Sequence, residues 1–269
     1  MLWNTWQQLA SPKGCCASLQ RMRIYNPNPQ ILQALQGSNI ELVLGIPNAK
    51  MWVQDNVKAY ANVKFRYIVV GNEVKPSDPF AKFIVPAMQN IQTAVSEPVA
   101  GKEIRVTTAI ESSALAQSSP PSIGVFRADY LEAFLDGVIK FLVLNHSPLV
   151  AKVHPYFIYA RNPTNVNFFR AIFSRNVTVV KDGKFEYKHL FEESVDSGWP
   201  TSGGGNTTTL DYARAYNTRV PYYVRYGTPK RPAVPIEAYV SSMFDENQKT
   251  HENEKFWGLF LPDKKLKYS

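Results

Sequence analysis

Residues 66–74, RYIVVGNEV, decide how this sequence is read. The run Ile-Val-Val at residues 68–70 is continuously apolar, which is typical of a β-strand that is buried on both faces. Because the run leads straight into Gly-Asn-Glu, Glu73 is predicted to lie where that strand ends. An acid in this place either favours the dipole of a following helix or takes part in chemistry. Asn72 favours the second reading, since an amide beside an acid can both donate to a substrate hydroxyl and accept from it.

Strand-like and helix-like segments alternate along the chain. We predict strands over residues 21–27, 40–47, 65–74, 104–110 and 149–157. We predict helices over residues 28–37, 49–61, 81–95 and 130–144. Strands that are apolar on both faces, each followed by an amphipathic helix, indicate a parallel sheet with covered faces. The predicted fold class is therefore α/β, a (β/α)8 barrel formed as one domain over residues 1–269, rather than two doubly wound domains. In such a barrel, function gathers at the carboxyl ends of the strands.

A second stretch, VDSGWPTSGGG at residues 195–205, also carries an acid, Asp196, directly after an apolar residue and close to a glycine. The ring of Trp199 follows it and suits stacking on a flat apolar face such as a sugar ring. The structural alternative for Asp196 is an Asx turn where a loop begins. A third stretch, MFDENQKTHENEKF, is charged and by itself reads as a solvated loop.

Composition excludes several classes of protein. The chain has 269 residues, of which 45% are apolar, 13% aromatic and 19% charged, so it is globular. Its net charge of +8 comes from scattered Lys and Arg, which favours a solvated basic surface over a nucleic-acid partner. No apolar run reaches the roughly 18 residues of a membrane span. The first residues lack the pattern of a secretory signal.

No cofactor or metal is expected. Cys15 and Cys16 are adjacent, which disfavours a disulfide between them, and the four His residues share no ligand spacing. No Gly-rich phosphate loop follows any predicted strand, which disfavours a nucleotide site.

A set of motifs in a fixed order then carries a resemblance over nearly the whole chain. The motifs are RMRIYNPN, ALQGSNIELVLGIPN, WVQDNVKAYANVKFRYIVVGNEV, FIVPAMQNI, PPSIGVFR, PYFIYARNP, SGWPTSGG, GTPKRP, MFDENQK and FWGLF. With them the sequence resembles the plant endo-1,3-β-glucanases of glycoside hydrolase family 17, which are (β/α)8 retaining enzymes. The resemblance implies β-1,3-glucan as the substrate and a monomeric protein of the vacuole, cell wall or extracellular space.

The resemblance also implies roles for single residues. Glu73 matches the family's acid/base, and Asp196 stands where the family has its Glu nucleophile. The residues that we expect to bind or support the substrate are Tyr25, Asn72, Tyr156, Trp199, Glu246, Lys249 and Glu254.

Four departures from the family pattern lead to an expectation of impaired activity. Asp196 is one methylene shorter than Glu, which withdraws the carboxylate by roughly 1.5 Å. A retaining glycosidase needs its two carboxyls about 5–5.5 Å apart. The family's first strand and the helix and strand before residue 196 lack counterparts, and the loop at residues 48–52 is shortened. We therefore expect an incomplete barrel with weak activity, and the alternative function is that of an inactive β-glucan-binding relative.

Overall fold

The structure is a computed structural model that describes residues 20–46, 52–96, 103–173, 180–187 and 196–268. Two compact units make up the chain. Unit 1 comprises Met1–Ala114 and Phe126–Val150, and unit 2 comprises Leu115–Val125 and Ala151–Ser269. The single domain over residues 1–269 stays a prediction. The stretches around residue 50 and before residue 196, where shortening is expected, lie largely outside the described residues.

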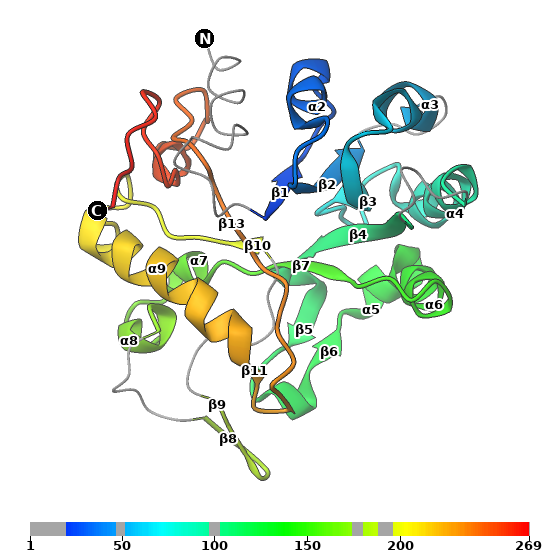
Figure 1. Ribbon diagram of the computed structural model, residues 1–269. Coiled ribbons are helices and arrows are strands. Elements are labelled where there is room, and N and C mark those ends of the chain that lie inside the picture. Colours follow the sequence, from blue (N-terminus) through cyan, green and yellow to red (C-terminus); the bar gives the residue numbers. More distant parts are fainter. Residues whose placement is uncertain (1–19, 47–51, 97–102, 174–179, 188–195, 269) are drawn as a thin grey trace. The chain divides into compact units, whose positions relative to one another are not determined.

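Unit 1 is built on four parallel strands that follow one another in chain order (Figure 1). These strands are β1 (Arg21–Ile24), β2 (Glu41–Ile46), β3 (Lys64–Asn72) and β4 (Arg105–Glu111). The helices between or after them are α2 (Pro29–Leu35), α3 (Trp52–Asn56), α4 (Ile84–Ala94), α5 (Ala128–Tyr130) and α6 (Asp136–Leu144). A π-helical turn, Leu131–Leu135, joins the last two. The predicted alternation of strands and helices is confirmed in this unit.

Local sequence explains where these elements begin and end. Asn28 caps α2, because its side-chain oxygen accepts hydrogen bonds from the N–H groups of Gln30 at 2.9 Å and Ile31 at 3.2 Å. Pro29 opens that helix, where its missing N–H costs nothing. Gly37 follows the helix with φ of +71°, a left-handed conformation that suits glycine.

The core of unit 1 lies on both faces of β3, since Ile68, Val69 and Val70 are all buried. The stripe predicted on the helix over residues 81–95 is buried as well, at Ile84, Met88, Ile91 and Val95. Continuous apolar strands of this kind are stable only when helices cover both faces of the sheet.

Unit 2 contains three short parallel strands in the order β7 (Val150–Lys152, of which the last two residues belong to this unit), β10 (Asp196–Ser197) and β13 (Tyr239–Val240). Its helices are α7 (Pro155–Arg161), α8 (Phe168–Ala171) and α9 (Leu210–Tyr226). Two-stranded sheets are formed by β5 (Leu115–Gln117) with β6 (Val125–Phe126, of which the last residue belongs to unit 1), by β8 (Val180–Asp182) with β9 (Phe185–Tyr187), and by β11 (Gly227–Thr228) with β12 (Arg231–Pro232).

The strand predicted over residues 149–157 is wrong in its second half. Strand β7 ends at Lys152, and α7 begins at Pro155. Proline has a backbone φ fixed near the helical value and is favoured at the first position of a helix, whereas it cannot donate a hydrogen bond within a sheet. His154 is still extended, and the chain turns into the helix directly after it.

The core of unit 2 is aromatic. Trp199, Tyr216, Phe173 and Tyr156 are each at most 2% exposed. Their rings meet largely edge to face or tilted, as at the 5.3 Å and 76° contact between Tyr156 and Trp199. Across the described ranges, no helix has both the length and the hydropathy that a membrane span requires.

Candidate active site

Glu73 follows β3 directly and has a left-handed backbone with φ of +54°. Its N–H donates to the carbonyl oxygen of Ala109 on β4 at 2.8 Å, so the neighbouring strand holds this conformation. A non-glycine residue in this region is strained, and such strain is commonly found at functional sites. The next helical turn is Ala81–Phe83, well beyond Glu73, so the acid does not start a helix.

Three predicted site residues of unit 1 gather at the carboxyl ends of β1 and β3. The side chain of Asn72 donates to Oε2 of Glu73 at 3.4 Å. Its oxygen accepts from Nη2 of Arg23 at 3.2 Å. The guanidinium of Arg23 in turn lies over the ring of Tyr25, 4.7 Å from the ring centroid. Tyr25 is 42% exposed, so part of its side chain faces solvent. Tyr25, Asn72 and half-buried Glu73 therefore form one connected surface.

Asp196 opens β10 in unit 2 and is held by its backbone between two strands. It pairs with Lys152 of β7 and with Tyr239 of β13. One residue further on, the N–H of Ser241 donates to the carbonyl oxygen of Ser197 at 2.8 Å. Gly198 then passes so close to the carbonyl of Ser241 that a Cβ atom would collide with it. The glycine of the SGWP motif thus permits a close backbone approach.

Trp199 and Tyr156 were predicted to contact substrate, and the structure places both in the core of unit 2. Trp199 has no exposed surface, and its Nε1 donates to the carbonyl oxygen of Thr207 at 3.1 Å. The hydroxyl of Tyr156 accepts from Nδ2 of Asn253 at 3.5 Å. Neither ring face is open for stacking on a sugar in this structure.

The charged residues of the MFDENQKTHENEKF stretch lie on a turn and a 3-10 helix, Glu252–Phe256. Lys249 and Glu246 form an exposed ion pair at 3.7 Å, which contributes little to stability because solvent screens it. Backbone hydrogen bonds fix the segment, since the N–H of Glu246 donates to the carbonyl oxygen of Lys255 at 3.0 Å. Glu254 is half-buried, and its N–H donates to the carbonyl oxygen of His251 at 3.0 Å.

The two predicted catalytic acids belong to different units, Glu73 to unit 1 and Asp196 to unit 2. A protonated carboxyl can protonate a leaving oxygen, and an ionised carboxylate can attack an acetal carbon. In the described part of the chain, no three His, Cys, Asp or Glu side chains come together as a possible metal site.

Sequence reasoning missed Glu111 and its partner. Glu111 ends β4 as Glu73 follows β3, and its carboxylate accepts from the hydroxyl of Tyr130 at 2.8 Å. Burial raises the pKa of Tyr130, so this hydroxyl keeps its proton and donates. The signal was available, because residues 104–111, IRVTTAIE, also run from an apolar segment into an acid.

The comparisons with known proteins identify the family and the fold. The sequence pattern of the family described as Glycosyl hydrolases family 17 matches residues 15–197 and 193–269. The chain belongs to this family. The family 17 chain is 42% identical over 284 residues to a glucan endo-1,3-beta-glucosidase of Vitis vinifera, covering 92% of this chain and 82% of that protein. It is also 36% identical over 302 residues to a basic vacuolar isoform of glucan endo-1,3-beta-glucosidase from Nicotiana plumbaginifolia, covering 99% and 81% of the two chains.

A solved structure of a plant beta-glucan endohydrolase fits the family 17 chain with a TM-score of 0.88 at 34% identity, covering 100% of this chain and 94% of that one. The predicted fold class, an incomplete (β/α)8 barrel, is therefore confirmed. Among the described residues, unit 1 has four parallel strands and unit 2 has three, where a complete barrel has eight. The family 17 chain is a glycoside hydrolase.

Proposed function

We propose that this family 17 glycoside hydrolase cleaves internal linkages of β-1,3-glucan with retention of configuration. The observation that carries the proposal is the 42% identity to a relative named glucan endo-1,3-beta-glucosidase over 92% of the chain. The Gly-Asn-Glu segment at the carboxyl end of β3 supports it, because that is where the fold class carries its chemistry.

In this proposal, Glu73 is the acid/base and Asp196 is the nucleophile. Glu73 protonates the leaving glycosidic oxygen while the Asp196 carboxylate forms a bond to the anomeric carbon. Glu73 then takes a proton from water, which attacks the same carbon and releases Asp196. The hydrogen bond from Asn72 supports the role of Glu73, because it fixes the direction of the carboxyl. Tyr25 supplies an exposed ring beside this acid for the sugar face.

We assign Trp199 and Tyr156 to the support of the site. Their rings pack under the loop that follows Asp196, and the contact between Trp199 and Thr207 closes that loop. We assign to Glu246, Lys249 and Glu254 the binding or support of the substrate.

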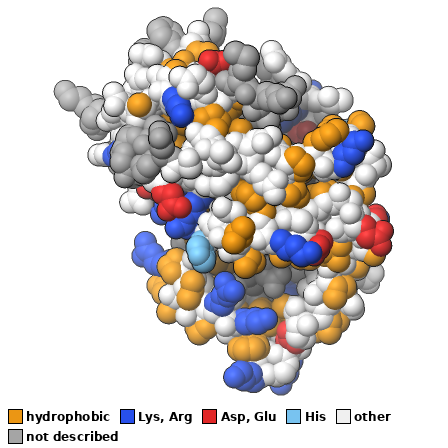
Figure 2. Space-filling model, turned by 90° about the vertical axis from the view of Figure 1, so that its right-hand side faces the viewer, with side chains coloured by type: hydrophobic (Ala, Val, Ile, Leu, Met, Phe, Trp, Pro, Cys, Tyr) orange, Lys and Arg blue, Asp and Glu red, His pale blue; other side chains and the backbone are white. Residues whose placement is uncertain are grey.

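The proposed partner is the glucan chain alone. Figure 2 shows Lys and Arg side chains at several separate places on one face, with acidic side chains beside some of them. This face, together with the scatter of Lys and Arg along the sequence, supports an uncharged polymer over a nucleic acid, which requires a dense basic surface. We further propose that the protein is a monomer. We also propose that it works in the vacuole or outside the cell, because one of its relatives is named a basic vacuolar isoform.

Release of reducing ends from laminarin tests the function. We expect the wild-type chain to release them and the Glu73→Gln and Asp196→Asn variants to lose at least about 100-fold in kcat, since general acid–base and covalent catalysis each contribute that much or more. Glu132→Gln, on an exposed acid of unit 1, is the matched control and keeps wild-type activity.

The alternative, an inactive glucan-binding relative, is not favoured, because the relatives carry the names of hydrolases. It predicts retention of the protein on insoluble β-1,3-glucan with no reducing ends released, unchanged by Glu73→Gln. That result would contradict the proposed function.

A further inference from the structure

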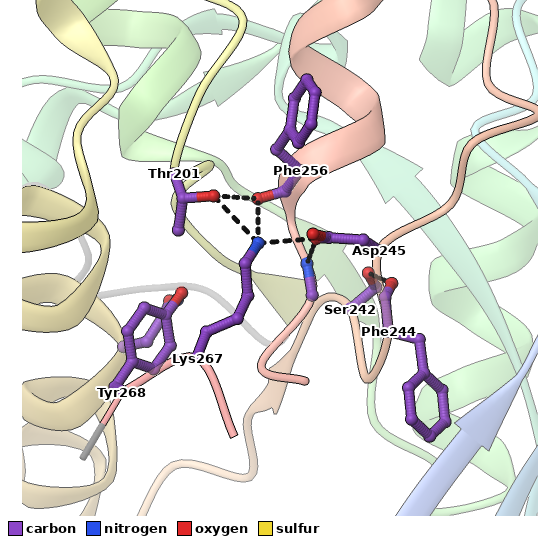
Figure 3. A network of polar contacts seen from close by, with 9 residues as sticks. Thr201, Ser242, Phe244, Asp245, Phe256, Lys267 and Tyr268 are labelled. Atoms are coloured by element: carbon purple, nitrogen blue, oxygen red, sulfur yellow. Dashed lines mark hydrogen bonds and ion pairs between the residues drawn. The ribbon is translucent and has the colours of Figure 1, made fainter. Parts of the chain in front are cut away.

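Lys267 is a lysine whose side chain is only 6% exposed. Its ammonium lies 2.7 Å from Oδ1 of Asp245 and donates to Oγ1 of Thr201 at 2.9 Å and to the carbonyl oxygen of Phe256 at 3.3 Å (Figure 3). An ammonium has three hydrogen-bond donors, and these three acceptors match them. A buried charge is tolerated when it is paired and hydrogen-bonded in this way.

The three acceptors come from three different segments, and each segment carries one predicted site acid. Thr201 lies in the loop that follows Asp196. Asp245 precedes Glu246 directly. Phe256 ends the 3-10 helix that contains Glu254. A single side chain therefore links the three segments of unit 2 that carry the predicted site acids Asp196, Glu246 and Glu254.

Further hydrogen bonds join the same segments to one another. Oδ1 of Asp245 also accepts from the N–H of Gly258 at 2.9 Å. The carbonyl oxygen of Phe256 accepts from both the N–H and the hydroxyl of Thr201, at 3.0 Å and 3.2 Å. Lys267 closes this network, because it alone contacts Asp245, Thr201 and Phe256 together among the hydrogen bonds of the described residues.

Hydrogen bonds also fix the backbone that carries Lys267. Its N–H donates to the carbonyl oxygen of Leu259 at 3.0 Å. The next residue, Tyr268, is buried, and its hydroxyl accepts from Nδ2 of Asn217 on α9 at 3.0 Å. These hydrogen bonds fix the backbone at residues 267 and 268, from which the side chain of Lys267 extends.

We propose that Lys267 is a positioning residue for the proposed hydrolysis, one that sets the distances among the segments of Asp196, Glu246 and Glu254. An apolar residue of similar size would fill the same volume, but it would leave the carboxylate of Asp245, whose side chain is 12% exposed, without its cation and Thr201 without this donor. Catalysis is sensitive to such changes, because a misplacement of about 1 Å costs on the order of 100-fold. This inference rests on the proposed function and adds to it a residue that touches no substrate.

The test compares Lys267→Met, Lys267→Arg and Lys265→Met with the wild type. Lys265 is the matched control, a lysine two residues away whose exposed side chain pairs with Asp263 on the surface. With laminarin, we expect Lys267→Met to lower kcat at least tenfold with KM changed less than threefold, since positioning acts in the transition state. We expect Lys267→Arg to restore part of kcat, because it keeps the charge and the donors, and Lys265→Met to equal the wild type.

Hydrogen exchange followed by mass spectrometry gives a second readout that needs no activity. In Lys267→Met, we expect faster exchange in peptides that cover residues 197–205 and 243–258, with exchange in unit 1 unchanged. Unchanged exchange in those peptides, or full kcat in Lys267→Met, would overturn the inference while leaving the proposed function intact. If Lys267→Met fails to fold, the Lys267→Arg variant decides. A measurable kcat below that of the wild type, with the same peptides protected from exchange, supports the inference. No measurable kcat in Lys267→Arg overturns it.

Failure of the proposed function looks different. In that case the wild-type chain itself releases no reducing ends, and Glu73→Gln changes nothing. The exchange measurement then decides the structural part of the inference alone.

Discussion

The side-chain amide of Asn72 donates to the carboxylate of Glu73 at 3.4 Å, although the two residues are neighbours in the chain. Glu73 has a left-handed backbone directly after the strand, with φ of +54°. Arg23 holds the other end of the same amide, so the direction of the Glu73 carboxyl is set from β1. Four consequences of the structure and the proposed roles can be measured.

Replacing Asn72 with Ala should weaken catalysis without unfolding unit 1. Asn72 is exposed, and its substitution removes one hydrogen bond to a carboxylate, so we expect kcat/KM on laminarin to fall about tenfold, or ~1.4 kcal/mol. Asn39→Ala serves as the control, since Asn39 accepts a surface hydrogen bond from Lys64. Equal kinetics for the two variants would contradict the link between Asn72 and Glu73.

Lengthening the proposed nucleophile should raise activity. In Asp196→Glu, the carboxylate reaches roughly 1.5 Å further. Because a 1 Å misplacement costs on the order of 100-fold, we expect kcat to rise tenfold or more if the Asp carboxylate falls short of the anomeric carbon. Initial rates on laminarin measure this. A lower rate for Asp196→Glu would show that the backbone around residue 196 is already placed for the shorter acid, and the expected impairment would be refuted.

Trp199 should behave as a core residue. Trp199→Ala removes a fully buried ring, and we expect it to lower the free energy of unfolding by about 3–5 kcal/mol. Denaturant titration followed by circular dichroism measures the loss. If Trp199 instead stacks on the substrate, Trp199→Ala leaves the free energy of unfolding unchanged and raises KM. That outcome would contradict its role as a core residue. Trp199→Phe separates ring burial from the hydrogen bond to Thr207.

Alkaline pH should destabilise the protein through Tyr268. Burial raises the pKa of this hydroxyl to about 12 from its ordinary value near 10. A raised native pKa means that the folded state holds the proton more tightly, so the stabilisation is fully present below pH 10 and is lost as the pH rises through 12. We expect Tyr268→Phe to reduce the fall in unfolding free energy between pH 10 and 12. Parallel curves for the variant and the wild type would contradict this assignment. Buried Tyr216, whose pKa is also raised by burial, accounts for part of the slope that remains.

Features with a local cause could be predicted from the sequence. Ile68, Val69 and Val70 read as a strand because a run of this kind must be buried on both faces, and Glu73 had to lie at its end. The cap at Asn28 and the break at Gly37 follow from single residues as well. The strand predicted over residues 149–157 ends at Lys152, because Pro155 starts a helix.

By itself, then, the sequence determined the family and the alternation of strands and helices in unit 1, because both are written in short contiguous stretches. The catalytic roles of Glu73 and Asp196 stay predictions. Only the tertiary structure decided that the rings of Trp199 and Tyr156 are buried and which segments share a hydrogen-bond network. Trp199 is enclosed because three helices of unit 2 pack around it, and no pattern near residue 199 encodes that packing. Lys267 and Asp245 are 22 positions apart in the chain, and their charged groups pair only in the folded protein, where both are largely shielded from water.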